Sequence, residues 1–371
     1  MGIVIPLLLI ILTSIIIWKS SDGFDVASSY LGRNLSDGVK GATINAISSS
    51  LPELLTTIFF LVFLKDAEGF SGGIGTVAGS AVFNAMIIPA FSVIVVYYYK
   101  IAKAIKVSKK VILRDSISLL LAQIILILII YFEMLNWIGG LILVLLYSFY
   151  VLYMFLKMEK NLPSSFDQEI TNTSGNRFIL FLKLDFFGAI IGNKRLNKSN
   201  SIVLLIISLF FIGISCLILV KACELIGEKE YSFLGFHNLK GLNLPISIIA
   251  LIIAAAATSV PDTILSVKDA KKGNYNDAIS NALGSNIFDI CFALGFPILM
   301  FTSFYGPILM DPVTLSFSLN ILIVLFLLTI VTFLIFVYGE SIGIGKAIFL
   351  LLMYVGFIIY IISTSTYPYL P

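Results

Sequence analysis

Long apolar runs separated by short polar stretches dominate this sequence. A helix that spans the hydrocarbon core of a bilayer needs about 20 mostly apolar residues. Ten runs come close to that length, at about 2–18, 41–64, 74–98, 111–132, 136–156, 201–223, 245–267, 277–301, 313–337 and 346–364. The pattern therefore predicts an all-α polytopic membrane protein with ten transmembrane helices.

The longest polar interval divides these helices into two sets of five. It covers roughly 157–200 and contains a Pro-Ser-Ser segment and several Lys and Asn residues. We predict a first five-helix unit over 1–157, a cytoplasmic linker over 158–200 and a second five-helix unit over 201–371. The first run lacks the basic flank and the cleavage site of a signal peptide, so we expect it to be the first membrane helix.

Composition agrees with a membrane protein and excludes several other classes. Of 371 residues, 59% are hydrophobic and 12% are charged, against about 25% charged residues in ordinary soluble domains. The net charge of +3 is too small to indicate nucleic acid or another acidic partner. The expected partners are the lipid bilayer and small ions, with no obligatory protein partner and no cofactor. His237 is the single histidine, so a histidine-based metal site is not expected.

Lys and Arg residues predict the orientation in the membrane, because they are enriched in cytoplasmic loops. The loops after the first, third, fifth, seventh and ninth predicted helices, with their helix ends, contain 20 of the 24 Lys and Arg residues. These loops are therefore predicted to be cytoplasmic, with both termini extracytoplasmic. We expect the protein in the cell membrane.

Two segments of the first half recur in the second half. Segment 49–57 (SSLPELLTT) aligns with 258–266 (TSVPDTILS), and 79–84 (GSAVFN) aligns with 284–289 (GSNIFD). Each pair lies in the second and third helices of its half. Five helices separate the two copies, and an odd number reverses the direction of the chain across the membrane. The sequence therefore predicts two inverted five-helix repeats, which in transporters enclose a site near the middle of the membrane.

Each repeat places a carboxylate beside a proline inside an apolar run. Glu53 follows Pro52, Asp262 follows Pro261, and Asp289 is a third acid in the eighth helix. A charged group at this depth costs at least about 2.5 kcal/mol and usually has a function. The central parts of the second, third, seventh and eighth helices contain no Lys or Arg that could pair with these acids.

Short oxygen-bearing side chains surround the acids. Carboxylates, hydroxyls and amides are hard ligands that suit Ca²⁺ and Na⁺. Ser50 and Ser259 precede an acid by three residues, and Ser80 and Ser285 precede Asn84 and Asp289 by four, so each pair shares a helix face. The candidate cation ligands are Glu53, Asp262, Asp289, Asn84, Ser50, Ser259, Ser80, Ser285, Ser49 and Thr258.

The paired motifs resemble the alpha-1 and alpha-2 repeats of the cation/Ca²⁺ exchanger superfamily. Segments 75–84 and 284–289 are most similar to the potassium-dependent sodium/calcium exchanger branch. The resemblance implies ten helices, of which the second, third, seventh and eighth enclose the ions. It also implies that Glu53 and Asp262 bind Ca²⁺ and share it with Na⁺. Ala46 and Ala255 match positions whose backbone carbonyls bind Na⁺.

Two positions depart from the superfamily pattern. Ser48 and Ala257 stand where glycine is frequent, and these larger side chains disfavour a close crossing of helices there. The acid of the second repeat is Asp262 where other branches have Glu, and the shorter side chain enlarges the expected cavity.

The predicted function is Na⁺/Ca²⁺ antiport by alternating access, and the sequence leaves K⁺ co-transport open. A Ca²⁺/H⁺ antiporter of the same superfamily is the main alternative, although its repeats usually carry Gly-Asn-Ala or Gly-Asn-Val before the acid. An intramembrane aspartyl protease needs a Gly-x-Gly-Asp element, which is absent, so we expect no enzyme. A channel is disfavoured because inverted repeats with broken helices are typical of alternating access.

Overall fold

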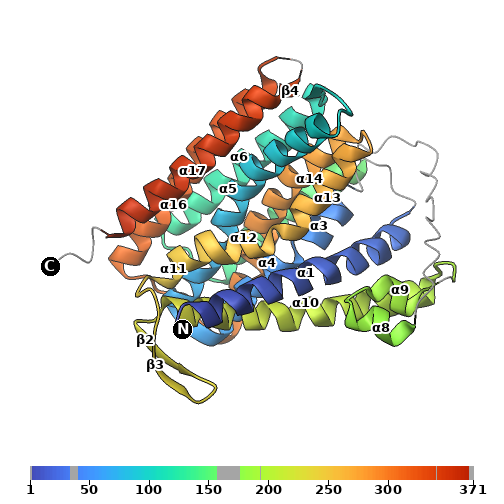
Figure 1. The fold of residues 1–371 in the computed structure, drawn as a ribbon. Helices are drawn as coiled ribbons and strands as arrows, with labels where there is room; N and C mark the ends of the chain where they lie inside the picture. The colour runs from blue at the N-terminus through green and yellow to red at the C-terminus, as the bar shows by residue number, and fades with distance from the viewer. Residues whose placement is uncertain (1, 34–40, 157–175, 193, 340, 367–371) are drawn as a thin grey trace.

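The computed structural model describes residues 2–33, 41–156, 176–192, 194–339 and 341–366, and it is almost entirely helical (Figure 1). The first half contains α1 (Val4–Leu31), η1 (Gly41–Asn45), α3 (Ala46–Ser49), α4 (Leu51–Leu64), α5 (Asp66–Tyr98), α6 (Lys109–Tyr131) and α7 (Trp137–Leu156). Two short helices, α8 (Arg177–Leu182) and α9 (Phe186–Ile190), precede the second half. Residues 157–175 of the predicted linker lie outside the described residues.

The second half has the same order of helices. It contains α10 (Lys198–Gly227), α11 (Ile246–Ile249), η2 (Ala250–Ala254), α12 (Ala255–Thr258), α13 (Val260–Lys271), α14 (Tyr275–Phe288), η3 (Asp289–Ala293), α15 (Gly295–Tyr305), α16 (Pro312–Val337) and α17 (Ile344–Thr366). Two antiparallel strand pairs were not expected from the sequence. They are β1 (Ala104–Ile105) with β4 (Ile342–Gly343), and β2 (Glu230–Phe233) with β3 (Phe236–Lys240).

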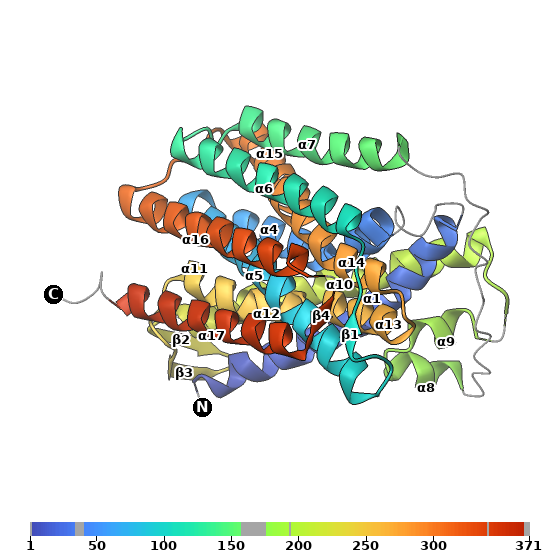
Figure 2. The ribbon, with the colours of Figure 1, turned by 90° about the horizontal axis from the view of Figure 1, so that it is seen from above.

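The number of membrane spans agrees with the prediction. Among the described residues, nine helices are long and apolar enough to cross a membrane. The bent pair Thr43–Ser49 and Leu51–Leu64, with an angle of 47° between its halves, supplies a tenth span when it is counted as one. The start of α1 and the end of α17 lie at the same end of the bundle, beside the β2–β3 hairpin (Figures 1 and 2). An even number of spans requires this arrangement.

The second and seventh spans break at equivalent serines. Ser50 ends α3 with φ −96° and ψ 7°, and Ser259 ends α12 with φ −79° and ψ 2°. A new helix then begins in each repeat, with Pro52 or Pro261 in its first turn, where the missing N–H costs little. Each break also follows a five-residue π-helix, η1 or η2, at the same distance along the chain. The two repeats therefore share their irregular backbone as well as their sequence motif.

The third and eighth spans differ from each other. The helix α5 is continuous past Asn84 and through Pro89. In the second repeat, the α-helix ends at Phe288, and the π-helix η3 begins at Asp289, the residue equivalent to Asn84. The longer α5 also starts at Asp66, well before the predicted residue 74. The eighth span runs over Tyr275–Tyr305, close to the predicted 277–301, with the π-helix η3 in its middle.

Two glycines allow α5 to cross the seventh span at very short range. A Cβ atom at Gly75 would lie 2.4 Å from the carbonyl oxygen of Ser247, and one at Gly79 would lie 2.0 Å from that of Leu251. Both distances are shorter than any side chain tolerates. The crossing brings the following turn of α5, which includes Ser80, against the break at Ser259.

The helices α1 and α10 lie side by side along one flank of the bundle (Figure 1). Ile17 and Phe24 of α1 and Ile212 and Leu219 of α10 belong to one apolar cluster. The predicted first span, 2–18, is too short, because α1 continues to Leu31. Its second half carries charged residues yet stays helical, since it packs against α10 and α9.

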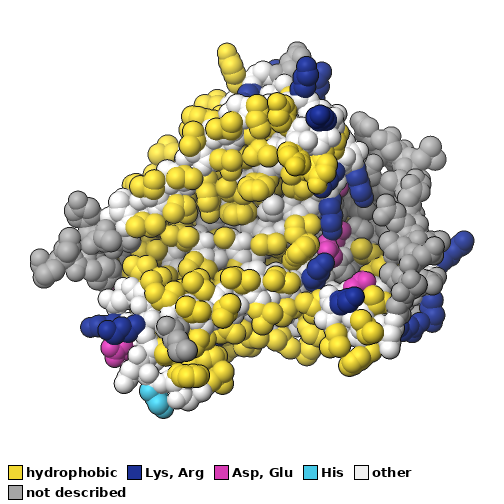
Figure 3. Space-filling model, viewed as in Figure 1, with side chains coloured by type: hydrophobic (Ala, Val, Ile, Leu, Met, Phe, Trp, Pro, Cys, Tyr) yellow, Lys and Arg dark blue, Asp and Glu magenta, His cyan; other side chains and the backbone are white. Residues whose placement is uncertain are grey.

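The surface is apolar over most of the face in Figure 3, with Lys and Arg gathered mainly at one end of the bundle. Large exposed hydrophobic side chains occur on α1, α6, α7, α10, α16 and α17. In a soluble protein such a surface would drive aggregation, but in a bilayer it faces lipid.

Inside the bundle, the carboxylate of Asp115 accepts hydrogen bonds from Arg114 at 2.5 Å, Ser280 at 2.8 Å and Tyr150 at 3.3 Å. These bonds connect α6 to α14 and α7.

Candidate ion-binding site

The three predicted acids lie at the centre of the bundle. Glu53 is in the first turn of α4, Asp262 is in the first turn of α13, and Asp289 begins η3. All three side chains are completely buried. The two broken spans meet at their breaks, and α5 and α14 cross beside them, so residues far apart in the sequence share one small volume.

Ser80 connects the two halves of this site. Its hydroxyl donates to Oε1 of Glu53 at 3.2 Å and faces Oδ2 of Asp289 at 3.1 Å. The Ser259 hydroxyl lies 2.9 Å from the Ser80 hydroxyl. A hydroxyl has one proton and two lone pairs, so Ser80 donates to one of these neighbours at a time. The short distances show how closely the oxygen atoms converge.

The second repeat makes the equivalent contact. Ser285, the counterpart of Ser80, donates to Oδ1 of Asp262 at 2.7 Å, as Ser80 does to Glu53. The amide of Asn84 lies 3.5 Å from Oδ2 of Asp262, and the Ser49 hydroxyl lies 3.4 Å from that of Ser285. The inverted repeats therefore bring oxygen-bearing side chains of both halves together at the centre of the bundle. This set, called the ring below, consists of Ser49, Ser50, Glu53, Ser80, Asn84, Ser259, Asp262, Ser285 and Asp289.

Several oxygen atoms of this ring have no hydrogen-bond partner among the described residues. They belong to Glu53 (Oε2), Asp289 (Oδ1), Asn84 (Oδ1) and Ser50. Buried polar atoms normally have partners, and each exception needs an explanation. The ion pairs found in the described part of the chain are Arg114–Asp115, Lys221–Glu224 and Lys268–Asp22, so none neutralises the three acids. The ring has the charge and the free acceptors that a cation requires.

The donor set favours some cations over others. Within the described residues, no group of three or more His, Cys, Asp and Glu side chains is arranged to hold a metal ion by itself. The carboxylates are instead joined through hydroxyl and amide groups. Such a mixed set of hard oxygen ligands suits Ca²⁺ and Na⁺ and offers nothing to soft metals.

Comparison with known proteins decides the family. A family model for sodium/calcium exchanger proteins matches residues 5–156 and 200–363. The chain belongs to the sodium/calcium exchanger family. Its activity is therefore cation/Ca²⁺ exchange, and the family consists of transporters and not of enzymes. The prediction of an integral multi-pass membrane protein is confirmed.

Individual relatives agree with this assignment. The exchanger is 28% identical over 282 residues to an uncharacterised membrane protein of Methanocaldococcus jannaschii, a match that covers 76% of this chain and 77% of the other. It is 37% identical over 126 residues to sodium/potassium/calcium exchanger 4 of Mus musculus, which covers 34% of this chain and 19% of the mouse protein. The shared part is thus a small fraction of the mouse exchanger.

Solved structures share the fold. A structure of the sodium-calcium exchanger NCX_Mj has a TM-score of 0.56 at 22% identity, over 95% of this chain and 97% of that one. A structure of the H⁺/Ca²⁺ exchanger CAX has a TM-score of 0.60 at 14% identity, over 97% and 88% of the two chains. Because these identities are low and the two transporters use different ions, the likeness establishes the fold alone.

The remaining predicted ligands of the exchanger are close to the ring. Ala46 and Ala255 directly follow η1 and η2, and both are buried. Their carbonyl oxygens accept the backbone N–H of Ser50 and of Ser259 at 3.0 Å, and each also accepts a side-chain hydroxyl, that of Ser49 at 3.4 Å and that of Thr258 at 3.2 Å. The Thr258 hydroxyl bonds to the carbonyls of its own helix, at 3.1 and 3.2 Å. The role of all these residues as ion ligands stays a prediction.

The structure shows what the side chain of Ser48 does at a position where the superfamily often has glycine. Ser48 donates to Ile44 of its own span at 2.6 Å and lies 2.8 Å from the hydroxyl of Ser28 in α1. Its side chain therefore contacts the flanking α1. The crossing of the other repeat is made by Gly75 and Gly79 of α5 instead.

Sequence reasoning missed two buried amides of α14. Asn281 donates to Ser266 at 3.0 Å, and Asn286 donates to the carbonyl of Ala81 at 2.9 Å. Asn286 and Ala81 are the equivalent positions of the aligned segments 79–84 and 284–289. The contact between them marks where the pseudo-two-fold axis passes between α5 and α14. A polar residue aligned with a small apolar one was the signal that could have revealed it.

Proposed function

We propose that this exchanger moves Na⁺ and Ca²⁺ in opposite directions through the ring of oxygen atoms around Glu53, Asp262 and Asp289. The observation that supports this most is the convergence of three fully buried carboxylates on Ser80 and Ser285. Some of their oxygens have no partner, and none of them forms an ion pair with a Lys or Arg among the described residues. Without a bound cation the three carboxylates destabilise the folded protein, since each unpaired buried charge is strongly destabilising. A bound cation removes that cost.

Charge counting supports competition between the two ions. Three ionised carboxylates supply about three negative charges. About three Na⁺ would neutralise them, whereas one Ca²⁺ leaves one charge over. The two ions therefore occupy the same ring alternately. The exchange of about three Na⁺ for one Ca²⁺ moves net charge across the membrane when no monovalent cation crosses with Ca²⁺, and it is electroneutral when one does.

The charge left over beside Ca²⁺ needs a monovalent partner. Asp289 stands where the first repeat has the neutral Asn84, so it supplies the extra charge. We propose that K⁺ or a proton neutralises Asp289 when Ca²⁺ is bound. K⁺ is favoured by the similarity to exchangers whose names include potassium.

Alternating access follows from the inverted repeats. Two halves related by an axis in the membrane plane form equivalent paths from opposite sides to a site at the breaks. The proposed orientation places both termini outside the cytoplasm, because the loops on the other side contain 20 of the 24 Lys and Arg residues. The proposed location is the cell membrane.

The decisive experiment is ⁴⁵Ca²⁺ uptake into proteoliposomes that contain only this protein. Imposed gradients of Na⁺, K⁺ and H⁺ are compared one at a time, each with and without an ionophore that removes it. We expect an outward Na⁺ gradient to drive uptake. If ⁴⁵Ca²⁺ uptake depends on the H⁺ gradient and not on the Na⁺ gradient, the protein is a Ca²⁺/H⁺ exchanger and the proposal is wrong.

A further inference from the structure

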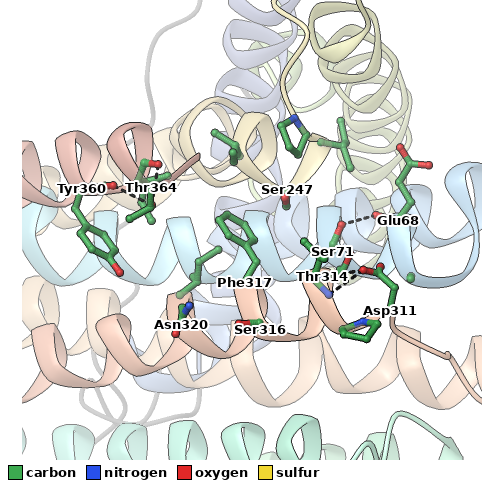
Figure 4. A pocket seen from close by; sticks show the side chains of 18 residues that line it. Glu68, Ser71, Ser247, Asp311, Thr314, Ser316, Phe317, Asn320, Tyr360 and Thr364 are labelled. Carbon is green, nitrogen blue, oxygen red and sulfur yellow. Dashed lines mark hydrogen bonds between the residues drawn. The ribbon is translucent and has the colours of Figure 1, made fainter. Parts of the chain in front are cut away.

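A separate cavity of about 760 Å³ lies between α5, α11, α16 and α17 (Figure 4). This volume falls within the range of about 300–1,000 Å³ that is usual for small-molecule sites. Its walls include Ser71 of α5, and nine residues of helix separate Ser71 from Ser80, a rise of about 14 Å. The cavity is therefore distinct from the ion ring.

Two acidic residues lie at one end of the cavity, which is called its mouth below (Figure 4). Among the described residues that line it, Glu68 and Asp311 carry the only charges, and no Lys, Arg or His is present. Asp311 caps α16 by accepting from the amides of Val313 and Thr314, each at 3.0 Å. The Thr314 hydroxyl and these amides hold the pKa of Asp311 below its usual value. The mouth is therefore negative at neutral pH.

The interior of the cavity is mostly apolar but contains an unpartnered hydroxyl. Ile246, Phe317 and Ile361 are among its apolar walls. Ser247 points into it (Figure 4), is 6% exposed, and makes no side-chain hydrogen bond to a described residue. From Asp311 to Ile321, the wall formed by α16 runs ten residues, or about 15 Å. The cavity thus combines an anionic entrance with a deep apolar wall.

We propose that this cavity binds an amphiphile that has an ammonium head group and an alkyl chain. The ammonium group lies between the carboxylates of Glu68 and Asp311, where its charge and its N–H donors are matched. The chain covers the apolar wall of α16, and a hydroxyl or amine near the head group pairs with Ser247. An anionic amphiphile is repelled at the mouth, and a neutral one gains only the apolar part.

Occupancy of this cavity is coupled to ion exchange through α11. This single turn leads directly into η2 and α12, which ends at Ser259 in the ion ring. Its Ser247 carbonyl is also packed against Gly75 of α5. An amphiphile wedged between α11 and α16 holds this turn in place, so it slows any exchange step in which the seventh span moves.

Direct binding is measured with radiolabelled decylammonium on the protein in nanodiscs, without any transport. The Glu68→Gln/Asp311→Asn variant is the test, because Asn retains the helix cap. Glu133→Gln, an exposed carboxylate away from the cavity, is the matched control. We expect saturable binding that weakens about tenfold or more in the double variant and is unchanged in the control. Equal binding by all three proteins, or equal competition by decanoate, would overturn the proposal.

A second variant tests the cavity without changing its charge. Ser316→Trp adds an indole at a residue that lines the cavity, and a single peak in size-exclusion chromatography checks that the variant is folded. Loss of binding is expected, and full retention would overturn the assignment. Nanodiscs with and without phosphatidylethanolamine then separate the sources of the head group, because a lipid occupant competes with decylammonium and a soluble amine does not.

Flux measurements test the coupling and rest on the proposed exchange. Saturating decylammonium should slow ⁴⁵Ca²⁺ exchange by wild-type protein several-fold and leave the double variant at its own basal rate. An unchanged wild-type rate with the cavity occupied would overturn the coupling while the binding result stands. Failure of the exchange itself would leave the binding measurement unaffected.

Discussion

The hydroxyl oxygens of Ser80 and Ser259 lie 2.9 Å apart although 179 residues separate them in the sequence. Ser80 belongs to the continuous helix α5, and Ser259 marks the break between α12 and α13. Each is near Glu53, at 3.2 and 3.5 Å. A helix of one repeat therefore completes the site at the broken helix of the other, and neither half holds the ring alone.

Removal of one central charge should abolish Ca²⁺ transport. Glu53→Gln and Asp262→Asn keep the shape of the side chain and delete a negative charge, so affinity for a divalent ion should fall by about 100-fold or more. Stability should rise slightly, because a buried charge is lost. Purified variants are compared by ⁴⁵Ca²⁺ uptake and thermal unfolding. Wild-type exchange in either variant would remove that residue from the site.

Replacement of the connecting hydroxyl should weaken binding and preserve the mechanism. Ser80→Ala removes the group that contacts Glu53, Asp289 and Ser259, and we expect Ca²⁺ affinity to fall by about 10- to 100-fold. The concentration dependence of uptake measures this change. Ser92→Ala, a buried serine in the same helix, is the control and should keep the wild-type affinity. Equal affinities would show that Ser80 only packs.

Na⁺ and Ca²⁺ should compete for one ring. Three carboxylates neutralise either one Ca²⁺ with a monovalent partner or about three Na⁺, but not both loads. Calorimetric titration with Ca²⁺ at rising Na⁺ concentrations should therefore give a falling apparent affinity and an unchanged number of sites. Tight binding of Ca²⁺ to protein already saturated with Na⁺ contradicts this prediction.

The third acid should determine the requirement for a monovalent cation. If K⁺ neutralises Asp289, Ca²⁺ uptake should increase with K⁺ on the Ca²⁺ side, and Asp289→Asn should remove that increase while retaining part of the Na⁺/Ca²⁺ exchange. Asn is the residue of the first repeat at this position, so the substitution makes the two repeats alike. Equal wild-type rates in K⁺ and in a large inert cation would assign the role to a proton.

The crossing of α5 with the seventh span should tolerate no added methyl group at Gly79. Gly79→Ala places Cβ 2.0 Å from the Leu251 carbonyl, so the helices must separate, at a cost of about 1–3 kcal/mol or more. The melting temperature and Ca²⁺ exchange should both fall. Gly213→Ala in α10 meets no atom within 4 Å and should be neutral or slightly stabilising. Similar losses in both variants would mean that the crossing is not the cause.

The sequence by itself determined the architecture and most of the candidate ligands. Apolar runs of membrane length indicated ten spans, because lipid requires every span to be long and apolar. Two prolines, each beside an acid at an equivalent position, predicted the breaks that the structure has at Ser50 and Ser259. The parity of the spans between the copies showed that the repeats are inverted.

Only the tertiary structure decided which atoms meet. That Ser80 lies between Glu53 and Asp289, and that Asn286 reaches its own counterpart Ala81, depends on helices that cross at glycines and touch over long sequence separations. The difference between the third and eighth spans could not be predicted from the hydrophobic pattern either, because a π-helix at Asp289 leaves hydrophobic periodicity almost unchanged. Periodicity records which face of a helix avoids water or lipid, whereas the partner of that face is set by packing between helices.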